Sequence, residues 1–159
     1  MSYLFRDQGA FNEDISNWNT GSVRSMLFMF NNASSFNKPL NKWNTGSVMT
    51  MEEMFKDASS FNQGVGKWDT SSVISMDGMF ANASSFNKNV GNWDTSKVTS
   101  MVNMFYGASQ FNQDLCKWRG KVPYLPFVAD MFKYSGCTNQ MDPMPDSGGI
   151  NWCAKTNCV

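Results

Sequence analysis

Apolar and polar positions along the chain repeat with a fixed period of 25 residues. Each period opens with a Phe-Asn pair, continues to a Trp, and ends with Val, two Met, Phe and Ala. The aromatic columns are Phe11, Phe36, Phe61, Phe86, Phe111 and Trp18, Trp43, Trp68, Trp93, Trp118, and the first Met column is Met26, Met51, Met76, Met101. A period of roughly 20–50 residues predicts a solenoid, because so short a unit cannot bury its apolar face alone.

The spacing within one period predicts two elements. Val, Met, Met, Phe and Ala fall at i, i+3, i+6, i+7 and i+10, which predicts short amphipathic helices near 22–33, 47–58, 72–83 and 97–108. The Thr and Ser residues before each stripe are suited to cap those helices. The stretch from Phe-Asn to Trp is too short for a second helix and predicts a short strand. The expected fold is an α/β repeat solenoid, with parallel strands on one face and helices on the other.

The repeat register divides the chain. Full repeats occupy 11–35, 36–60, 61–85 and 86–110, a partial repeat occupies 1–10, and 111–118 starts a last coil. We therefore expect a solenoid over 1–118 and an irregular C-terminal cap over 119–159. Because 1–10 matches only the second half of a repeat, we also expect further repeats upstream.

The repeat as a whole, F-N-x-x-L-x-x-W-[DN]-T-x-x-V-x-x-M-x-x-M-F-x-x-A-S-S, resembles the BspA-like leucine-rich repeat of bacterial and mycoplasma surface proteins. The ending, with "FNQDLCKW", "MFKYSGC" and "WC", is similar to the cysteine-bearing cap of marine microalgal members. The resemblance implies a leucine-rich-repeat-like, right-handed solenoid used as an adhesion or protein-binding scaffold. It implies little about activity, since function resides in sites carried by a fold.

The cysteines predict two disulfides in the cap. All four follow the last regular repeat, at Cys116, Cys137, Cys153 and Cys158, and their spacing does not match a zinc site. Three pairings are open, and Cys116 with Cys137 is preferred because that bond would tie the last strand to the last helix. Disulfides predict an extracellular, cell-surface or oxidising luminal location.

Composition argues against several function classes. Thirteen basic residues balance thirteen acidic ones, so no electrostatic footprint for nucleic acid is present. No apolar run predicts membrane insertion, and the N-terminal residues do not form a signal peptide. The chain has no histidine and no carboxylate pair in a unique context, so we expect neither an enzyme nor a cofactor or metal site.

Several repeated side chains have a structural and a functional interpretation. The Met columns are core rather than soft-metal ligands, and the Trp column covers the core edge rather than offering a stacking platform. The Asn after each Phe predicts a ladder between coils. Asp69 and Asp94, replaced by Asn19 and Asn44 in sister repeats, predict turn residues. The row Thr20, Thr45, Thr70, Thr95 is assigned to helix caps, and the alternative is an ice-binding array of this row together with Ser22, Ser47 and Ser72.

Positions that vary between repeats are the candidate partner surface, because the fixed positions form the core. They include Glu13, Lys38, Gln63 and Lys88 in the strand segment, and Leu27, Phe28 and Met49, which are apolar on the predicted helix. Asn32 and Asn82 are candidate glycosylation sites in "NAS" sequons. We expect a non-enzymatic protein-binding or adhesion solenoid with an unidentified protein partner. The alternative is a structural or accessory subunit of a larger complex, and a more distant one is ice or carbohydrate binding.

Overall fold

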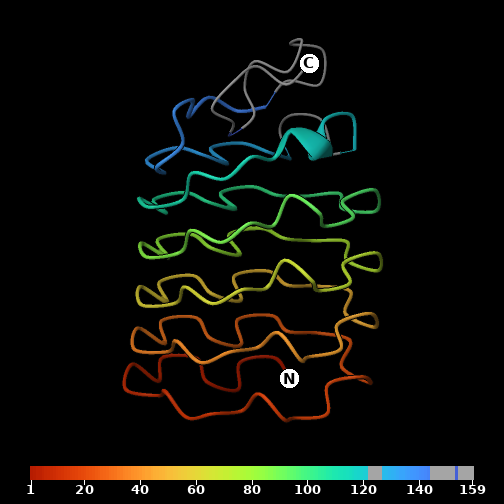
Figure 1. The fold of residues 1–159 in the computed structure, drawn as a ribbon, viewed down its shortest axis with the longest axis vertical. Helices are drawn as coiled ribbons and strands as arrows, with labels where there is room; N and C mark the ends of the chain where they lie inside the picture. The colour runs from red at the N-terminus through yellow and green to blue at the C-terminus, as the bar shows by residue number, and fades with distance from the viewer. Residues whose placement is uncertain (122–126, 144–152, 154–159) are drawn as a thin grey trace.

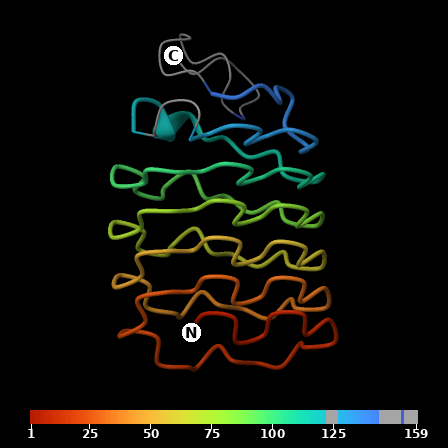
Figure 2. The same cartoon turned by 180° about the vertical axis from the view of Figure 1, so that it is seen from behind.

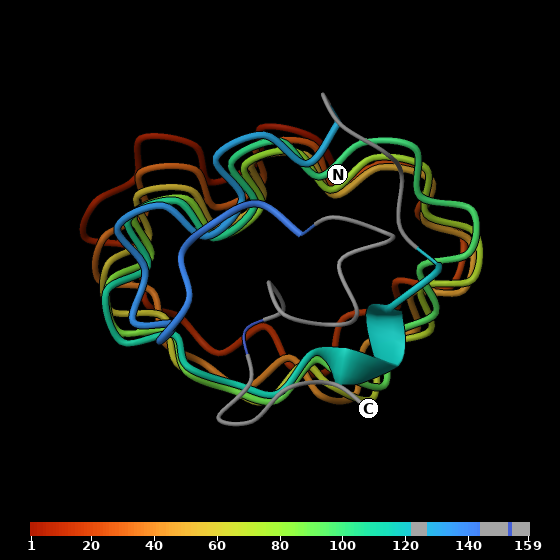
Figure 3. The same ribbon diagram turned by 90° about the horizontal axis from the view of Figure 1, so that it is seen from above.

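The chain winds into coils that stack along one long axis, about one coil for each repeat (Figures 1 and 2). The structure is a computed structural model and describes residues 1–121, 127–143 and 153. Viewed down the stacking axis, successive coils superimpose on a flattened loop (Figure 3). Equivalent residues of neighbouring repeats therefore lie beside each other in columns parallel to the axis.

The predicted α/β fold class is wrong. In the described ranges the only helix is the 3-10 helix η1, Cys116–Trp118, and no strand forms. Parallel pairing is limited to isolated bridges that join Ser25 with Thr50, Thr50 with Ser75, and Ser75 with Ser100. The helices expected near 22–33, 47–58, 72–83 and 97–108 and the strands expected from each Phe-Asn pair are all absent.

A string of overlapping turns replaces each expected helix. The N–H groups of Met29, Asn31 and Ala33 bond to the carbonyl three residues earlier, at 3.0–3.2 Å. The N–H groups between them, of Phe28, Phe30 and Asn32, bond instead to carbonyls of the next coil, at 2.8–3.0 Å. An α-helix would direct every interior N–H to the carbonyl four residues back, so alternate bonding to a neighbouring coil is incompatible with it.

Left-handed residues enforce these turns. Each coil has two positions with positive φ, four residues apart, such as Phe28 (54°) with Asn32 (58°) and Asn103 (56°) with Gly107 (67°). A positive φ at the third residue of a turn gives a type II geometry, which a right-handed helix cannot contain. The second of these columns reads Asp7, Asn32, Asp57, Asn82, Gly107. Those residue types favour the left-handed region, so the signal was present in the sequence but was overlooked.

The fixed apolar columns form one continuous core. Met26, Met51, Met76 and Met101 are fully buried, which confirms that this column packs. Phe rings of neighbouring coils stack, with ring centroids 5.3 Å apart for Phe30 and Phe55. Phe30 also stacks on Phe36, six residues along the chain, with ring centroids 4.1 Å apart. Each such ring removes a large apolar area from water and adds a favourable aromatic contact.

Polar ladders run beside the core. The Asn ladder is confirmed, because the N–H of Asn37, Asn62, Asn87 and Asn112 each donates to the side-chain oxygen of the Asn one coil earlier, at 3.0–3.1 Å. The indole N–H groups of Trp43, Trp68 and Trp93 donate to carbonyls of the preceding coil, at 3.0–3.1 Å. These bonds satisfy polar groups that would otherwise be buried unpaired.

The Thr row is also a ladder, and both earlier interpretations of it are wrong. Thr20, Thr45, Thr70 and Thr95 are at most 1% exposed, and their hydroxyls donate to carbonyls of the next coil at 2.9–3.2 Å. Buried hydroxyls cannot present an ice-binding array. They cap no helix either, because none follows them in the described residues.

The last described coil follows the repeat with a small shift. The N–H of Met101 donates to the carbonyl of Phe127, 26 residues later in the chain. The N–H of Met76 donates to the carbonyl of Ser100, 24 residues later. Past this point Cys137 and Cys153 form a disulfide with a Cα–Cα distance of 5.2 Å. The preferred pairing of Cys116 with Cys137 is therefore wrong; Cys116 is disulfide-bonded too, while Cys158 and much of the proposed cap over 119–159 lie outside the described residues. The preference rested on a last helix that does not form.

Candidate binding surface

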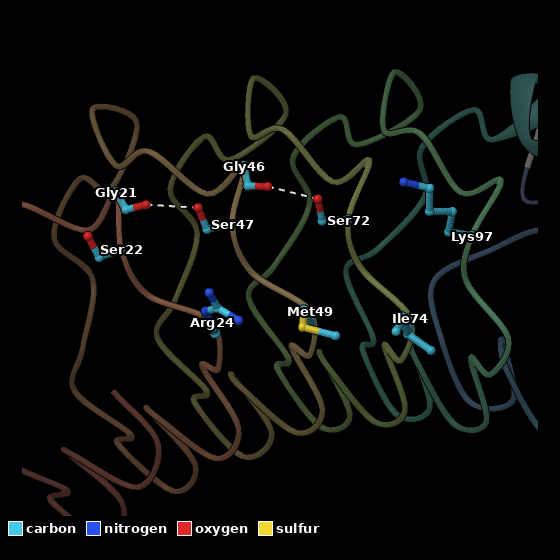
Figure 4. A pocket seen from close by; sticks show the side chains of 9 residues that line it. All are labelled: Gly21, Ser22, Arg24, Gly46, Ser47, Met49, Ser72, Ile74 and Lys97. Carbon is cyan, nitrogen blue, oxygen red and sulfur yellow. Dashed lines mark hydrogen bonds between the residues drawn. The ribbon is translucent and has the colours of Figure 1, made fainter.

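A groove of about 670 Å³ follows the stacking axis across four consecutive coils. Its lining comes from equivalent positions of successive repeats, and Figure 4 shows those side chains in two rows. One row is Ser22, Ser47, Ser72 and Lys97, and the other is Arg24, Met49 and Ile74; Gly21 and Gly46 complete the lining. The row of Arg24, Met49 and Ile74 therefore differs from coil to coil, whereas the other row is Ser in three coils and Lys in the fourth.

The backbone of the groove wall is already hydrogen-bonded. The backbone N–H of Met49 donates to the carbonyl of Arg24, and that of Ile74 donates to the carbonyl of Met49, both at 2.8 Å. The Ser47 and Ser72 hydroxyls donate to the carbonyls of Gly21 and Gly46, at 2.9 and 2.8 Å (Figure 4). Recognition here thus depends on side chains rather than on adding a strand to an open edge.

Two apolar side chains lie uncovered in the middle of the groove. Met49 is 45% exposed and Ile74 is 41% exposed, and they occupy neighbouring coils. The same column carries Arg24 before them and Thr99 after them. Exposed apolar residues that adjoin on a groove mark a candidate interaction site more strongly than scattered ones do.

The charged side chains that line the groove are both cations, Arg24 and Lys97. Acids stand just outside it: the Ser71 hydroxyl and N–H hold the pKa of Asp69 below its ordinary value, and Ser96 does the same for Asp94. Lys97 adds to the lowered pKa of both acids. The backbone N–H of Ser71 donates to the Asp69 carboxylate and that of Ser96 donates to the Asp94 carboxylate, both at 3.0 Å. These bonds confirm Asp69 and Asp94 as turn residues.

Comparison with protein families decides the membership of this chain. The model described as "Mycoplasma protein of unknown function, DUF285" matches residues 1–72 and 41–142. The chain belongs to this family. No curated protein and no solved structure matches it. Membership establishes that the chain is a repeat protein of this family.

The remaining predicted partner residues lie in other columns. Glu13, Lys38, Gln63 and Lys88 share one column, and the Gln63 amide donates to the Asn37 carbonyl and side-chain oxygen, at 3.1 and 3.0 Å. Gln63 also borders a hollow of about 320 Å³ with Pro39 and Lys67. This column is thus partly engaged in the Asn ladder.

Phe28 belongs to a separate aromatic cluster. Its ring stacks on Tyr3 at 5.1 Å, and the Arg6 guanidinium lies 5.2 Å from the Phe28 ring centroid. Leu27 is half-buried in the adjacent column. The structure therefore does not bring Leu27, Phe28 and Met49 into one groove, since only Met49 lines the groove described above.

The sequon residues Asn32 and Asn82 are exposed and share one column. The Asn32 amide donates to Asp7 and the Asn82 amide donates to Asp57, at 3.1 and 2.9 Å. Both residues have positive φ, so the repeated Asn is explained by a turn requirement. Glycosylation of either residue stays a prediction.

A second hollow, of about 600 Å³, has the opposite character to the groove. It is lined by Glu53, Asp77 and Asp130 together with Lys56, whose ammonium lies 3.1 Å from Glu53. In the part of the chain that the structure describes, no three acidic, Cys or His side chains are placed to hold a metal ion. A search of the same residues finds no helix that could span a membrane.

Sequence reasoning identified Met49 as unusual but passed over Ile74 and the role of Lys97. The available signal was the column Arg24, Met49, Ile74, Thr99, where two apolar residues stand between polar ones. The 25-residue period alone aligns these four residues, so Ile74 could have been identified from the sequence.

Proposed function

We propose that this chain is a non-enzymatic protein-binding or adhesion repeat protein, and that the groove of Arg24, Met49, Ile74 and Lys97 is its binding surface. The observation that carries this proposal is the pair of exposed apolar side chains in a groove whose wall is joined by backbone hydrogen bonds between coils. The repeat core uses the fixed columns, so this variable surface is where binding specificity resides. The resemblance to BspA-like surface repeats supports the same reading.

The proposed location is extracellular, at the cell surface, or in an oxidising lumen. The Cys137–Cys153 disulfide supports this, because such bonds persist mainly in oxidising compartments. Family membership is consistent with a repeat surface protein, and the description of the family assigns no activity.

Site-specific photo-crosslinking from the groove tests the proposal. A photoreactive amino acid at Ile74 should trap a defined protein in the native source, while the same group at the exposed Lys42, outside the groove lining, serves as the matched control. Equal labelling from both positions, or no protein adduct from Ile74, would overturn the binding role of the groove.

A second candidate is an accessory subunit within a larger assembly. Its support is the solenoid architecture, whose repeated surface can serve as a scaffold within an assembly. Stoichiometric co-purification of the full chain with a large complex would favour this alternative.

A further inference from the structure

The groove and the second hollow differ in the charge of their lining. The groove has cations at its two ends, Arg24 and Lys97, and no acidic side chain in its lining. The second hollow is predominantly acidic, with Glu53, Asp77 and Asp130. The lining of the groove is therefore positive, while Asp69 and Asp94 stand just outside it near Lys97. Charge of one sign along a groove selects a partner of the other sign.

We infer that the groove binds an extended acidic peptide segment of a partner protein, with one apolar side chain between two carboxylates; this rests on the proposed function. The apolar side chain would pack on Met49 and Ile74, and the carboxylates would reach Arg24 and Lys97. All four side chains line the same groove (Figure 4).

The dimensions of the groove set the spacing of the peptide. Arg24 and Lys97 lie in different rows and three coils apart, which is about 14 Å along the axis if neighbouring coils are about 4.8 Å apart, as paired chains are. An extended chain covers that length in about four residues, at roughly 3.3 Å for each residue. Side chains at i, i+2 and i+4 point to one face, so acid–x–apolar–x–acid is the pattern that fits.

The two cations are not equivalent. Lys97 has two acids, Asp69 and Asp94, as neighbours just outside the groove, and their charges offset part of its own. Arg24 is exposed, and none of the ion pairs found among the described residues includes it. A planar guanidinium also matches a carboxylate with two hydrogen bonds. Arg24 is therefore the main anchor, and Lys97 contributes less.

Fluorescence anisotropy with a labelled Gly-Asp-Ser-Leu-Ser-Asp-Gly peptide tests this on the full chain. We expect saturable binding that weakens as salt is added, and no binding of peptides with Asn or Lys in place of both Asp residues. Arg24→Gln should weaken binding at least about threefold, and Lys97→Ser should weaken it less. Ile74→Thr, which inserts the residue of the next coil, should weaken it by up to about tenfold. Lys42→Gln, at an exposed lysine outside the groove lining, is the control that should leave affinity unchanged.

Failure of this inference can be separated from failure of the proposed function. Equal binding of the Asn or Lys peptide, or an unchanged affinity in Arg24→Gln, overturns the acidic-peptide inference alone if Ile74 still crosslinks to a partner. Sequencing the crosslinked peptide gives an independent readout: an acid–x–apolar–x–acid segment supports the inference, and any other sequence overturns it. Absence of both peptide binding and crosslinking removes the inference and the proposed function together.

Discussion

At the residue scale, the closeness of neighbouring coils decides which side chains the backbone tolerates. A Cβ added at Gly66 would lie 2.2 Å from the carbonyl oxygen of Asn89 in the next coil. Gly64, two residues earlier in the same coil, has open space at that point. The two glycines thus form a matched pair, one at a close backbone approach and one on a free surface.

We expect Gly66→Ala to destabilise the protein by about 2 kcal/mol or more, because a backbone carbonyl must move to admit the methyl group. Gly64→Ala should be neutral or slightly stabilising, by up to about 0.5 kcal/mol, since it restricts the unfolded chain. Urea unfolding of both variants measures the difference. Similar midpoints for the two would contradict the coil spacing.

The turn aspartates predict a pH dependence of stability. Hydrogen bonds from Ser71 and Ser96 hold the pKa of Asp69 and Asp94 below the ordinary value of 3.8. A lowered pKa in the folded state contributes stability above the unfolded value, and that contribution is lost as pH falls through the folded value. The loss therefore occurs below about pH 4.

Replacing both aspartates with Asn, the residue that Asn19 and Asn44 provide in the same turn, should reduce this acid sensitivity. We expect the melting temperature of Asp69→Asn/Asp94→Asn to fall less between pH 7 and pH 3 than that of the original chain. Glu52, whose pKa is raised by burial, Asp77 and Glu53, should favour the folded state as it becomes protonated, so its effect has the opposite sign. An identical pH profile for the double variant would show that these turns do not depend on ionised Asp.

At the element scale, the turn string is the unit that sequence reasoning mistook for a helix. A stripe of apolar residues at three- and four-residue spacing fits an α-helix. Overlapping four-residue β-turns bury the same positions. The core columns could therefore be predicted while the backbone that presents them could not. The Asn ladder and the Asx turns were predictable because they depend only on local side-chain chemistry repeated in register.

Asn103 distinguishes the two backbones. Its φ is 56°, and the same column contains Gly78 in the preceding repeat. We expect Asn103→Gly to be more stable than Asn103→Ala by about 1 kcal/mol, because Ala is penalised in the left-handed region. In an α-helix the order would be reversed. Thermal unfolding of both variants gives the order directly, and greater stability of the Ala variant would restore the helical interpretation.

The Trp ladder offers a second comparison within one element. The Trp68 indole N–H donates to the Leu40 carbonyl at 3.0 Å, whereas the buried Trp118 indole N–H has no hydrogen-bond partner among the described residues. Replacement by Phe removes some packing at both sites, and in Trp68→Phe it also removes the indole bond to the Leu40 carbonyl, which keeps only its bond from the Trp43 N–H. We expect Trp68→Phe to cost about 1 kcal/mol more than Trp118→Phe in urea unfolding. Equal losses would mean that the indole bond contributes nothing.

At the scale of the whole molecule, each coil contacts mainly its neighbours, so damage at one end should remain local. The Cys137–Cys153 disulfide closes a loop with a sequence separation of 16 residues beside the last described coil. Such a bond stabilises by about 2–4 kcal/mol, largely through the unfolded chain.

We expect the double variant Cys137→Ser/Cys153→Ser to lose amide hydrogen-exchange protection in residues 101–118 and 127–137. Protection around Phe36 and Phe61 should stay unchanged, because several intact coils separate them from the bond. Exchange measured by mass spectrometry tests both halves of this expectation. A uniform loss over the stack would show that the coils unfold as one cooperative unit.

The candidate groove also belongs to this scale, and it was only partly foreseeable. Met49 was conspicuous because other repeats carry a different residue at its position. The groove that joins Arg24, Met49, Ile74 and Lys97 along the axis depends on how the coils superimpose. That alignment follows from the backbone ladder, which the helix and strand assignment misplaced.

The backbone ladder has a further consequence for how such a chain is built and copied. Its bonds between the regular coils join residues about one repeat apart in sequence, such as Met26 with Thr50 and Met76 with Ser100. Adding a coil therefore closes one more loop of the same length and introduces no longer-range contact, so the entropy of each closure stays constant as the stack grows. Duplication or loss of one 25-residue unit in the gene would lengthen or shorten the molecule without changing its topology.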